Sequence, residues 1–235
     1  MRRPNELTEK LNQENIQEGT FEALELDLMS MDSVKSFAKQ ILDKNIKIDV
    51  LINNAGIMFG SRKETQDGFE SQLATNYLGH FLLTHLLLPK LKEAGKSGES
   101  ARIINVSSAA HHGGCWLDWN DFQSKYVLHN VKIIEFYYSS NIFFRFRKFY
   151  QPEGAYCISK AAQVMMTIYL DQKLSSLEDT HVKVSAVHPG IVKTDLYVNV
   201  RYMTVSTEVS VTSVGISEFY AQDSVTKIPS NQLSQ

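Results

Sequence analysis

Tyr156 and Lys160, in the stretch AYCISK at 155–160, are the residues whose types and spacing first suggest chemistry. Four positions separate them, so on a helix their side chains are neighbours. The pKa of a tyrosine phenol is about 10, which makes it a poor acid–base group at neutral pH. An ammonium group one turn away stabilises the phenolate and lowers that pKa. The pair alone, however, is more typical of a solvated helix face.

Ser108 is the third residue of this candidate set. It ends the run ARIINVSS at 101–108, whose hydrophobicity is typical of a buried strand. A serine hydroxyl can hold a substrate oxygen by a hydrogen bond while a nearby phenol transfers the proton. Ser108, Tyr156 and Lys160 together therefore predict proton transfer at an oxygen whose carbon exchanges a hydride.

The order of elements predicts an α/β fold with a doubly wound parallel sheet. Apolar residues recur at helical spacing over 31–44, and Ser30 is placed to cap that helix. Long helical patterns alternate with short β-branched runs, which is typical of parallel strands covered on both faces. We expect helices over 31–44, 68–92 and 154–177, and strands over 48–56, 101–108 and 182–190.

The expected strands end in small or polar residues, with NNAG after the first, SS after the second and HPG after the third. In doubly wound sheets, ligands bind at the carboxyl ends of the strands. Small residues let a ligand approach the backbone closely. These three strand ends therefore predict a ligand site along one edge of the sheet.

Composition excludes several classes of protein. The chain has 235 residues, enough for one large α/β domain, and its net charge of −2 argues against nucleic-acid binding. Two cysteines exclude a disulfide framework. The start of the chain is too polar for a signal peptide, and the longest apolar run, 81–88, is too short to span a bilayer. We expect a soluble or peripheral protein without a metal site, since no acidic or cysteine partner accompanies the histidines at ligand spacing: His80, His111, His112 and His188.

Five motifs occur in a fixed order along the chain: NNAG (53–56), NYLGHF (76–81), INVSS (104–108), YCISK (156–160) and HPGIVKTD (188–195). In these motifs the chain resembles the short-chain dehydrogenases/reductases, and the sequences of the motifs are most similar to the retinol-dehydrogenase branch of that family. The resemblance implies a Rossmann-like fold and a nicotinamide cofactor, NADP or NAD.

The resemblance assigns catalytic roles to four residues. Tyr156 would be the general acid/base, and Lys160 would lower its pKa and bind the ribose of the nicotinamide. Ser108 would orient the substrate oxygen, and Asn76 would hold a water in the proton relay. From the residues alone, Asn76 could equally be an exposed polar residue of its helix, and Asn53 with Asn54 could simply make a turn.

The resemblance also assigns residues to the cofactor. On the adenosine side it places Asp27 at the adenine ring, with Asn53, Ala55 and Gly56 supporting the sheet. On the nicotinamide side, beside Tyr156 and Lys160, it places Pro189, Gly190 and Thr194. Arg2 and Arg3 fall where members that prefer NADP carry a basic residue, and a guanidinium there would pair with the 2′-phosphate.

The chain departs from the family pattern in three places. We expect that it lacks the first strand–helix–strand unit with its glycine-rich phosphate loop, which leaves a partial Rossmann-like domain over 1–200 and an irregular tail over 201–235. Ser108 and Tyr156 are 48 positions apart, a wider spacing than in the relatives of this branch. The segment between them is rich in aromatic residues: of the 22 Phe and Tyr residues of the chain, 10 lie in 122–150. The probable insertion 126–149 is either a membrane-contacting or substrate-gating flap or, as we favour, a translated intron.

The expected function is an oxidoreductase that transfers a hydride between NADP(H) and a lipophilic alcohol or carbonyl compound, retinoid-like or steroid-like. The alternative is a catalytically impaired, truncated isoform that acts as a non-enzymatic binding protein. The partners expected are that small substrate, a membrane surface in peripheral contact, and a second copy of the chain, since many family members are dimers or tetramers. The compartment is left open between the cytoplasm and the surface of the endoplasmic reticulum or lipid droplets.

Overall fold

A computed structural model describes residues 22–95, 100–116, 121–124, 150–177, 181–190, 196 and 212–214 of the protein. Helix α2, Met31–Asp43, begins where the sequence predicts. The Ser30 side chain caps it by accepting from the backbone N–H of Ser33, which satisfies one free donor of the first turn. Val34 and Ala38, one turn apart, form its buried stripe.

A continuous helical run follows, in place of the single helix expected over 68–92. It consists of α3 (Ser71–Leu73), the π-helical turn η1 (Ala74–Leu78) and α4 (Gly79–Gly95). In a π turn the hydrogen bonds span five residues, which widens the helix and often marks a functional position. Asn76 lies in that turn.

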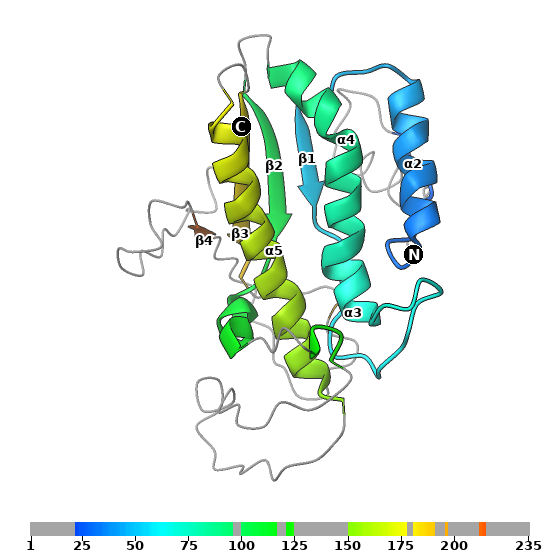
Figure 1. Ribbon diagram of the computed structural model, residues 1–235, viewed down its shortest axis with the longest axis vertical. Coiled ribbons are helices and arrows are strands. Elements are labelled where there is room, and N and C mark those ends of the chain that lie inside the picture. The colour runs from blue at the N-terminus through cyan, green and yellow to red at the C-terminus, as the bar shows by residue number, and fades with distance from the viewer. Residues whose placement is uncertain are drawn as a thin grey trace, which may run out of the picture.

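The sheet has the strand order β1-β2-β3-β4 in the described part of the chain. Strands β1 (Val50–Asn53), β2 (Ala101–Val106) and β3 (Val182–His188) are parallel, with Asn53 opposite Asn105 in the register. The short strand β4 (Thr212–Val214) pairs antiparallel with β3. Helix α5 (Pro152–Ser175) connects back to β3 and lies across the sheet beside α4 (Figure 1).

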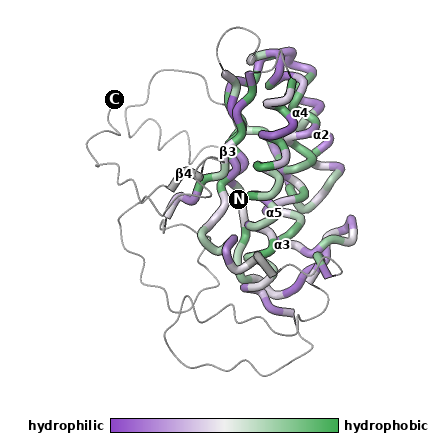
Figure 2. The backbone as a smooth tube through the Cα atoms, turned by 60° about the vertical axis from the view of Figure 1, so that its left-hand side comes forward, coloured by the Kyte–Doolittle hydropathy of each residue, from purple (hydrophilic) through white to green (hydrophobic). Residues whose placement is uncertain are grey.

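Helices α2, α4 and α5 lie on one side of the sheet, as Figures 1 and 2 show. The core lies between these helices and the inward-facing strand residues. One cluster joins β2 and β3 to α4 and α5, and the other joins α2 to α4. On the opposite face, Val50, Ile52, Arg102 and Lys183 are exposed. The sequence predicted helices over both faces of the sheet. In the described part of the chain, helices cover one face and the other face is exposed.

Most expected elements are confirmed, with ends shifted by a few residues. The 3₁₀ helix η2 (Ala109–Trp116) and strand β4 are additions that the sequence did not predict. Strand β4 falls inside the range 201–235 that we expected to be irregular. The segment 126–149 lies outside the described residues, so its predicted status as an insertion stays a prediction. Among the described helices, none combines the length and the hydropathy that a bilayer crossing requires.

Gly79 allows α4 to pack against the turn that precedes α2. A Cβ at Gly79 would lie 2.7 Å from the carbonyl oxygen of Leu28. Such overpacking costs about 1–3 kcal/mol, toward the upper end here because the obstructing atom belongs to the backbone, and the gain of about 1 kcal/mol that alanine has over glycine within a helix offsets part of that cost. We therefore expect Gly79→Ala to lower the free energy of unfolding by about 1–2 kcal/mol in urea titrations.

Gly60→Ala is the matched control, because no heavy atom lies within 4 Å of a Cβ added there. Its free energy of unfolding should change by about 0.5 kcal/mol or less. A Gly79→Ala protein that is as stable as the wild type would contradict the close packing of α4 on Leu28.

Candidate active site

The ends of β1 and β2 lie beside the first half of α5 (Figure 1), and these segments carry several of the candidate residues. Helix α5 begins with Pro152, whose fixed φ suits the first turn of a helix, after the N-cap residue Gln151. Tyr156 and Lys160 are each only 4% exposed and lie on the side of α5 that faces the sheet end. The structure therefore buries the pair that the sequence could have left in solvent.

The Lys160 ammonium is the central cation of the site. Its Nζ lies 5.7 Å from the centroid of the Tyr156 ring. It donates hydrogen bonds to the Val106 carbonyl oxygen at 2.8 Å and to Gln163 Oε1 at 3.0 Å. Burial lowers the pKa of Lys160 to about 8, because the charged form loses solvation. The ammonium is thus held by two oxygens, and it loses its proton far more readily than a surface lysine.

Helix α5 contains a second tyrosine–lysine pair with the same spacing, Tyr169 and Lys173. Lys173 Nζ lies 5.5 Å from the Tyr169 ring centroid and donates to its hydroxyl at 3.3 Å. Tyr169 is 54% exposed. Water screens charges in such a position and makes their interaction small. Burial, not spacing, therefore distinguishes Tyr156 and Lys160 from an ordinary solvated pair.

The loop after β1 forms the other side of the Tyr156 environment. The Phe59 ring stands edge-on to the Tyr156 ring, with centroids 5.5 Å apart and planes at 85°. A Cβ added at Gly56 would lie 3.2 Å from Asn76 Oδ1 and 3.8 Å from Lys160 Nζ. Glycine at position 56 therefore leaves a space open next to the ammonium that any side chain would fill. Ala55, its neighbour, is exposed.

Asn76 is fully buried, so the alternative of an exposed helix residue is wrong. Its carboxamide accepts from the Ile57 N–H at 2.9 Å and donates to the Ile57 carbonyl at 3.0 Å. It also donates to Ser159 Oγ at 2.9 Å. Asn76 therefore fixes the loop after β1 to α5, and its expected role in holding a water stays a prediction.

Asn53 lies at the end of β1 and connects the two long helices through the sheet. Its Nδ2 donates to Thr84 on α4 at 2.9 Å and to Asn105 on β2 at 2.7 Å. Asn105 in turn donates to Thr167 on α5 at 2.8 Å. The alternative in which Asn53 only makes a turn is therefore wrong, whereas Asn54 is exposed beside it. These hydrogen bonds are consistent with a role of Asn53 in supporting the sheet, and its predicted role at the cofactor stays a prediction.

Ser108 lies two residues after the end of β2, half-buried, with η2 beginning at the next residue. Its Oγ accepts from the Ala110 N–H at 3.2 Å, and its carbonyl accepts from the His111 N–H at 3.0 Å. The neighbouring Ser107 donates to the Lys160 carbonyl oxygen at 2.9 Å. This bond connects the end of β2 to the turn of α5 that carries Lys160.

The remaining predicted cofactor residues lie at other strand and helix ends. Asp27 is exposed in the turn before α2, where its Oδ1 accepts from the Met29 N–H at 2.9 Å. Pro189 and Gly190 follow β3, half-buried, and Gly190 has a φ of 76°, which favours glycine. Thr194, Arg2 and Arg3 lie outside the described residues.

His80, one turn after Asn76 on α4, is a buried titratable group that sequence reasoning did not place in the site. It is 3% exposed, and its Nδ1 lies 3.1 Å from the Asn76 carbonyl oxygen. Burial, reinforced by the nearby Lys160 charge, lowers the pKa of His80 to about 4. His80 is therefore neutral at neutral pH. Over the described part of the chain, no group of three or more His, Cys, Asp or Glu residues could hold a metal ion.

Cys157 follows Tyr156 on α5 and is 8% exposed. Burial, with a contribution from the Glu153 carboxylate, raises the pKa of its thiol to about 11. The thiol is therefore protonated near neutral pH and is a poor nucleophile there.

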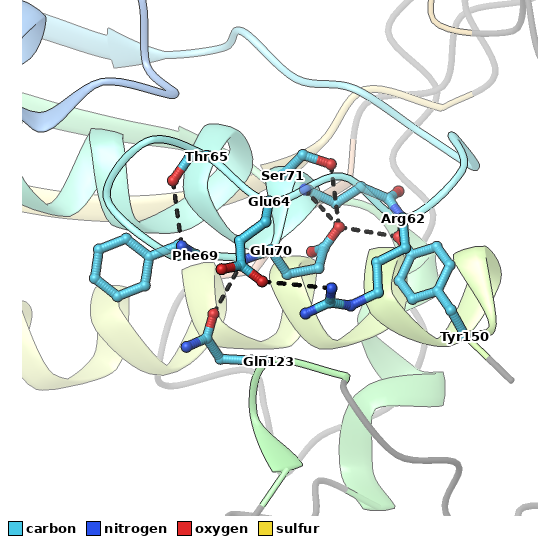
Figure 3. A network of polar contacts seen from close by, with 9 residues as sticks. Arg62, Glu64, Thr65, Phe69, Glu70, Ser71, Gln123 and Tyr150 are labelled. Atoms are coloured by element: carbon cyan, nitrogen blue, oxygen red, sulfur yellow. Dashed lines mark hydrogen bonds and ion pairs between the residues drawn. The ribbon is translucent and has the colours of Figure 1, made fainter. Parts of the chain in front are cut away.

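A second polar cluster, which the sequence did not predict, lies around Glu70 at the start of α3 (Figure 3). Glu70 is 1% exposed and caps the helix by accepting from the N–H groups of Gln72 and Leu73. Tyr150 donates to Glu70 Oε1 at 2.9 Å from just before α5. The cluster therefore joins the starts of α3 and α5.

Residues 1–116 match the family model described as short chain dehydrogenase. The chain is 39% identical to human polyprenol dehydrogenase over 199 residues, which cover 85% of this chain and 53% of that protein. It is 40% identical to human retinol dehydrogenase 13 over 174 residues, with coverages of 74% and 44%. The chain thus spans about half the length of the curated relatives it matches.

Solved structures give the same fold. The NADPH-bound carbonyl reductase from chicken fatty liver is 26% identical, with a TM-score of 0.53 and coverage of 83% of this chain and 66% of that one. Pseudomonas aeruginosa RhlG in its NADP active-site complex has a TM-score of 0.56 at 20% identity, with coverages of 85% and 64%. The latter likeness concerns the fold alone.

The burial of His80 predicts that the free energy of unfolding depends on pH. Its pKa is about 4 in the folded protein against an ordinary 6.5, so the unfolded chain binds a proton more readily between these values. Acidification through this window therefore lowers the free energy of unfolding, by up to about 1.4 kcal/mol per pH unit. We expect the wild type to lose stability relative to His80→Asn as the pH falls from 6.5 to 4 in urea titrations.

His85→Asn, on an exposed position of the same helix, is the control. Its side chain is exposed, so the comparison of the two variants isolates the effect of burying an imidazole. A His80→Asn difference that is independent of pH would show that His80 is solvated in the folded protein.

Proposed function

Because the chain belongs to the short-chain dehydrogenase family, we propose that it is an oxidoreductase that interconverts a lipophilic alcohol and its carbonyl compound with NADP(H). In this proposal Tyr156 is the general acid/base. The single observation that carries it is the burial of Tyr156 and Lys160 side by side at the strand ends, with Nζ 5.7 Å from the ring centroid.

The proposed chemistry of Tyr156 rests on the electrostatics of this burial. In a low-dielectric site the attraction between an ammonium and a phenolate is several times stronger than in water. Lys160 would therefore favour the ionised form of Tyr156. Its own pKa of about 8 means that this support fades as the pH rises above 8.

The residues around Lys160 fit the nicotinamide side of a dinucleotide. Gly56 leaves a space next to Nζ that a Cβ would fill, and Gly190 lies after the neighbouring strand end. Lys160 would hold the ribose hydroxyls there, with Pro189, Gly190 and Thr194 flanking the ring and Asp27 at the adenine. When bound, the nicotinamide would accept or supply the hydride. The similarity to an NADPH-bound carbonyl reductase, which is 26% identical, supports the choice of cofactor.

The chain's own residues would handle the proton. In alcohol oxidation, the Tyr156 phenolate takes the hydroxyl proton as the substrate carbon gives up its hydride, and a carbonyl forms. In the reverse direction the phenol returns the proton to the oxygen. Ser108, at the end of β2, would hold the substrate oxygen by a hydrogen bond. Asn76 would support the site by fixing the loop after β1 to α5.

Apolar side chains next to Tyr156 support a lipophilic substrate. The Phe59 ring packs on the tyrosine ring, and Ile57, beside Gly56, is 36% exposed. The similarity to a polyprenol dehydrogenase and a retinol dehydrogenase supports the same class. Isoprenoid alcohols are therefore the substrates to test first.

Tyr156→Phe tests the proposal, because it removes the hydroxyl and keeps the ring packed. We expect kcat/KM for NADP-dependent oxidation of retinol or a polyprenol to fall about 100- to 10,000-fold, the usual contribution of a general acid/base. NADPH absorbance measures the turnover, and NADPH fluorescence measures cofactor binding, which should persist in the variant.

Tyr169→Phe is the matched control, since it changes the exposed tyrosine of the second pair on the same helix. It should keep wild-type turnover. Undiminished turnover in Tyr156→Phe would overturn the assignment of Tyr156. A wild-type chain that binds NADPH and turns over none of these alcohols or their carbonyl compounds would instead support the non-enzymatic binding protein.

A further inference from the structure

Gln72, on α3, is fully buried, and its carboxamide bonds to both segments that enclose Tyr156. We propose that Gln72 is a positioning residue for Tyr156: it clamps the Phe59 loop to the start of α5 and so holds the Tyr156 phenol in place beside the Lys160 ammonium. This inference rests on the proposed function only in naming Tyr156 as the reacting group. The contacts themselves are properties of the fold.

The first arm of the clamp is the bond to Phe59. Gln72 Oε1 accepts from the Phe59 backbone N–H at 2.9 Å. Phe59 has a φ of 56°, a left-handed conformation that costs a non-glycine residue about 1 kcal/mol or more. Such a conformation persists only where surrounding contacts hold it. The Gln72 bond is one such contact, and it fixes the backbone from which the Phe59 ring reaches the Tyr156 ring.

The second arm holds the start of α5. Gln72 Nε2 donates to the Pro152 carbonyl oxygen at 3.0 Å and to the Tyr150 hydroxyl at 2.6 Å. Pro152 is the first residue of α5, and Tyr156 lies one turn further along the same helix. The first N–H groups of a helix have no partner within the helix, so its first turn frays easily. Fixing Pro152 therefore restrains the turn that carries Tyr156.

Glu70 anchors this second arm (Figure 3). The Tyr150 hydroxyl accepts from Gln72 and donates to Glu70 Oε1 at 2.9 Å. Burial and the Glu70 carboxylate raise the pKa of Tyr150, so its phenol stays protonated and remains a donor. Glu70 also accepts from the Gln72 backbone N–H at 2.9 Å. Gln72 is thus held through both its backbone N–H and its side chain.

A fixed Tyr156 matters because its chemistry depends on position. The interaction of two charges falls with their separation, most steeply at short range. In many enzymes a misplacement of about 1 Å costs about 100-fold in rate. If the Phe59 loop and the start of α5 drift apart, the Tyr156 ring loses its packing against Phe59 and can turn away from the Lys160 ammonium. Its phenolate then loses part of the stabilisation that the ammonium supplies.

Gln72→Met tests the clamp, since methionine has a similar length and packs in a buried site but makes none of these hydrogen bonds. The primary readout is the pKa of the Tyr156 phenol, obtained from ultraviolet absorbance titrations. Subtracting the titration of the corresponding Tyr156→Phe protein isolates this one phenol from the other tyrosines. We expect its pKa to rise by about half a unit or more in Gln72→Met.

Tyr150→Phe provides a second variant if Gln72→Met does not fold. It removes one partner of the clamp and leaves the bond from Gln72 to Pro152, so we expect a smaller rise of the same sign. Val34→Ala, in the cluster between α2 and α4, is the control for lost stability. It should lower the melting temperature without moving the pKa of Tyr156.

The test of the Gln72 clamp can fail or succeed independently of the test of the proposed enzymatic function. A Tyr156 pKa that is unchanged in a folded Gln72→Met or Tyr150→Phe protein overturns the clamp, whatever the enzyme turns over. A raised pKa in a chain without turnover supports the clamp and counts against the proposed function. In an active wild type, we expect kcat of Gln72→Met to fall about tenfold while KM for NADP stays within about twofold. A fall in kcat that only follows the folded fraction also overturns the clamp.

Discussion

The buried ammonium of Lys160 is the interaction on which the rest of the site depends. A lysine charge taken out of water costs several kcal/mol unless other groups replace the lost solvation. Val106 and Gln163 supply two oxygens to it, and Ser107 holds the turn from which the lysine extends. These partners belong to β2 and α5, so the cation stays in place only while the strand end and the helix remain packed together.

The packing of β2 on α5 is itself supported by buried amides. The chain of hydrogen bonds from Thr84 through Asn53 and Asn105 to Thr167 crosses two strands and joins both long helices. A buried polar chain of this kind specifies one register, because a shift of one residue would leave its donors and acceptors unpaired. The same fold feature that aligns the strands therefore brings their carboxyl ends level with the first half of α5.

Much of the architecture could be predicted from the sequence, because periodicity and caps are local. Helix α2 begins at the predicted cap, Ser30, and the parallel strands follow their β-branched runs. The faces of the sheet were harder to assign. Arg102 and Lys183 alternate with buried residues in β2 and β3, yet the overall hydrophobicity of these runs suggested strands covered on both sides.

The site shows more clearly what local patterns cannot supply. Tyr169 and Lys173 repeat the spacing of Tyr156 and Lys160, and only tertiary packing makes one pair buried and the other exposed. The contacts of Gln72 join residues about 80 positions apart, and no periodicity reports such a pair. Glu70 was missed as a cap because glutamate is not among the residues that usually occupy this position.

The protonated thiol of Cys157 gives the site a built-in probe of motion. It adjoins the tyrosine in sequence and is shielded by the packing of α5. An alkylating reagent reaches this sulfur when the packing around the first half of the helix opens, and bulk solvent then restores its ordinary acidity. The rate at which Cys157 is alkylated therefore reports how often the protein opens around Tyr156, a local motion that equilibrium stability alone does not reveal.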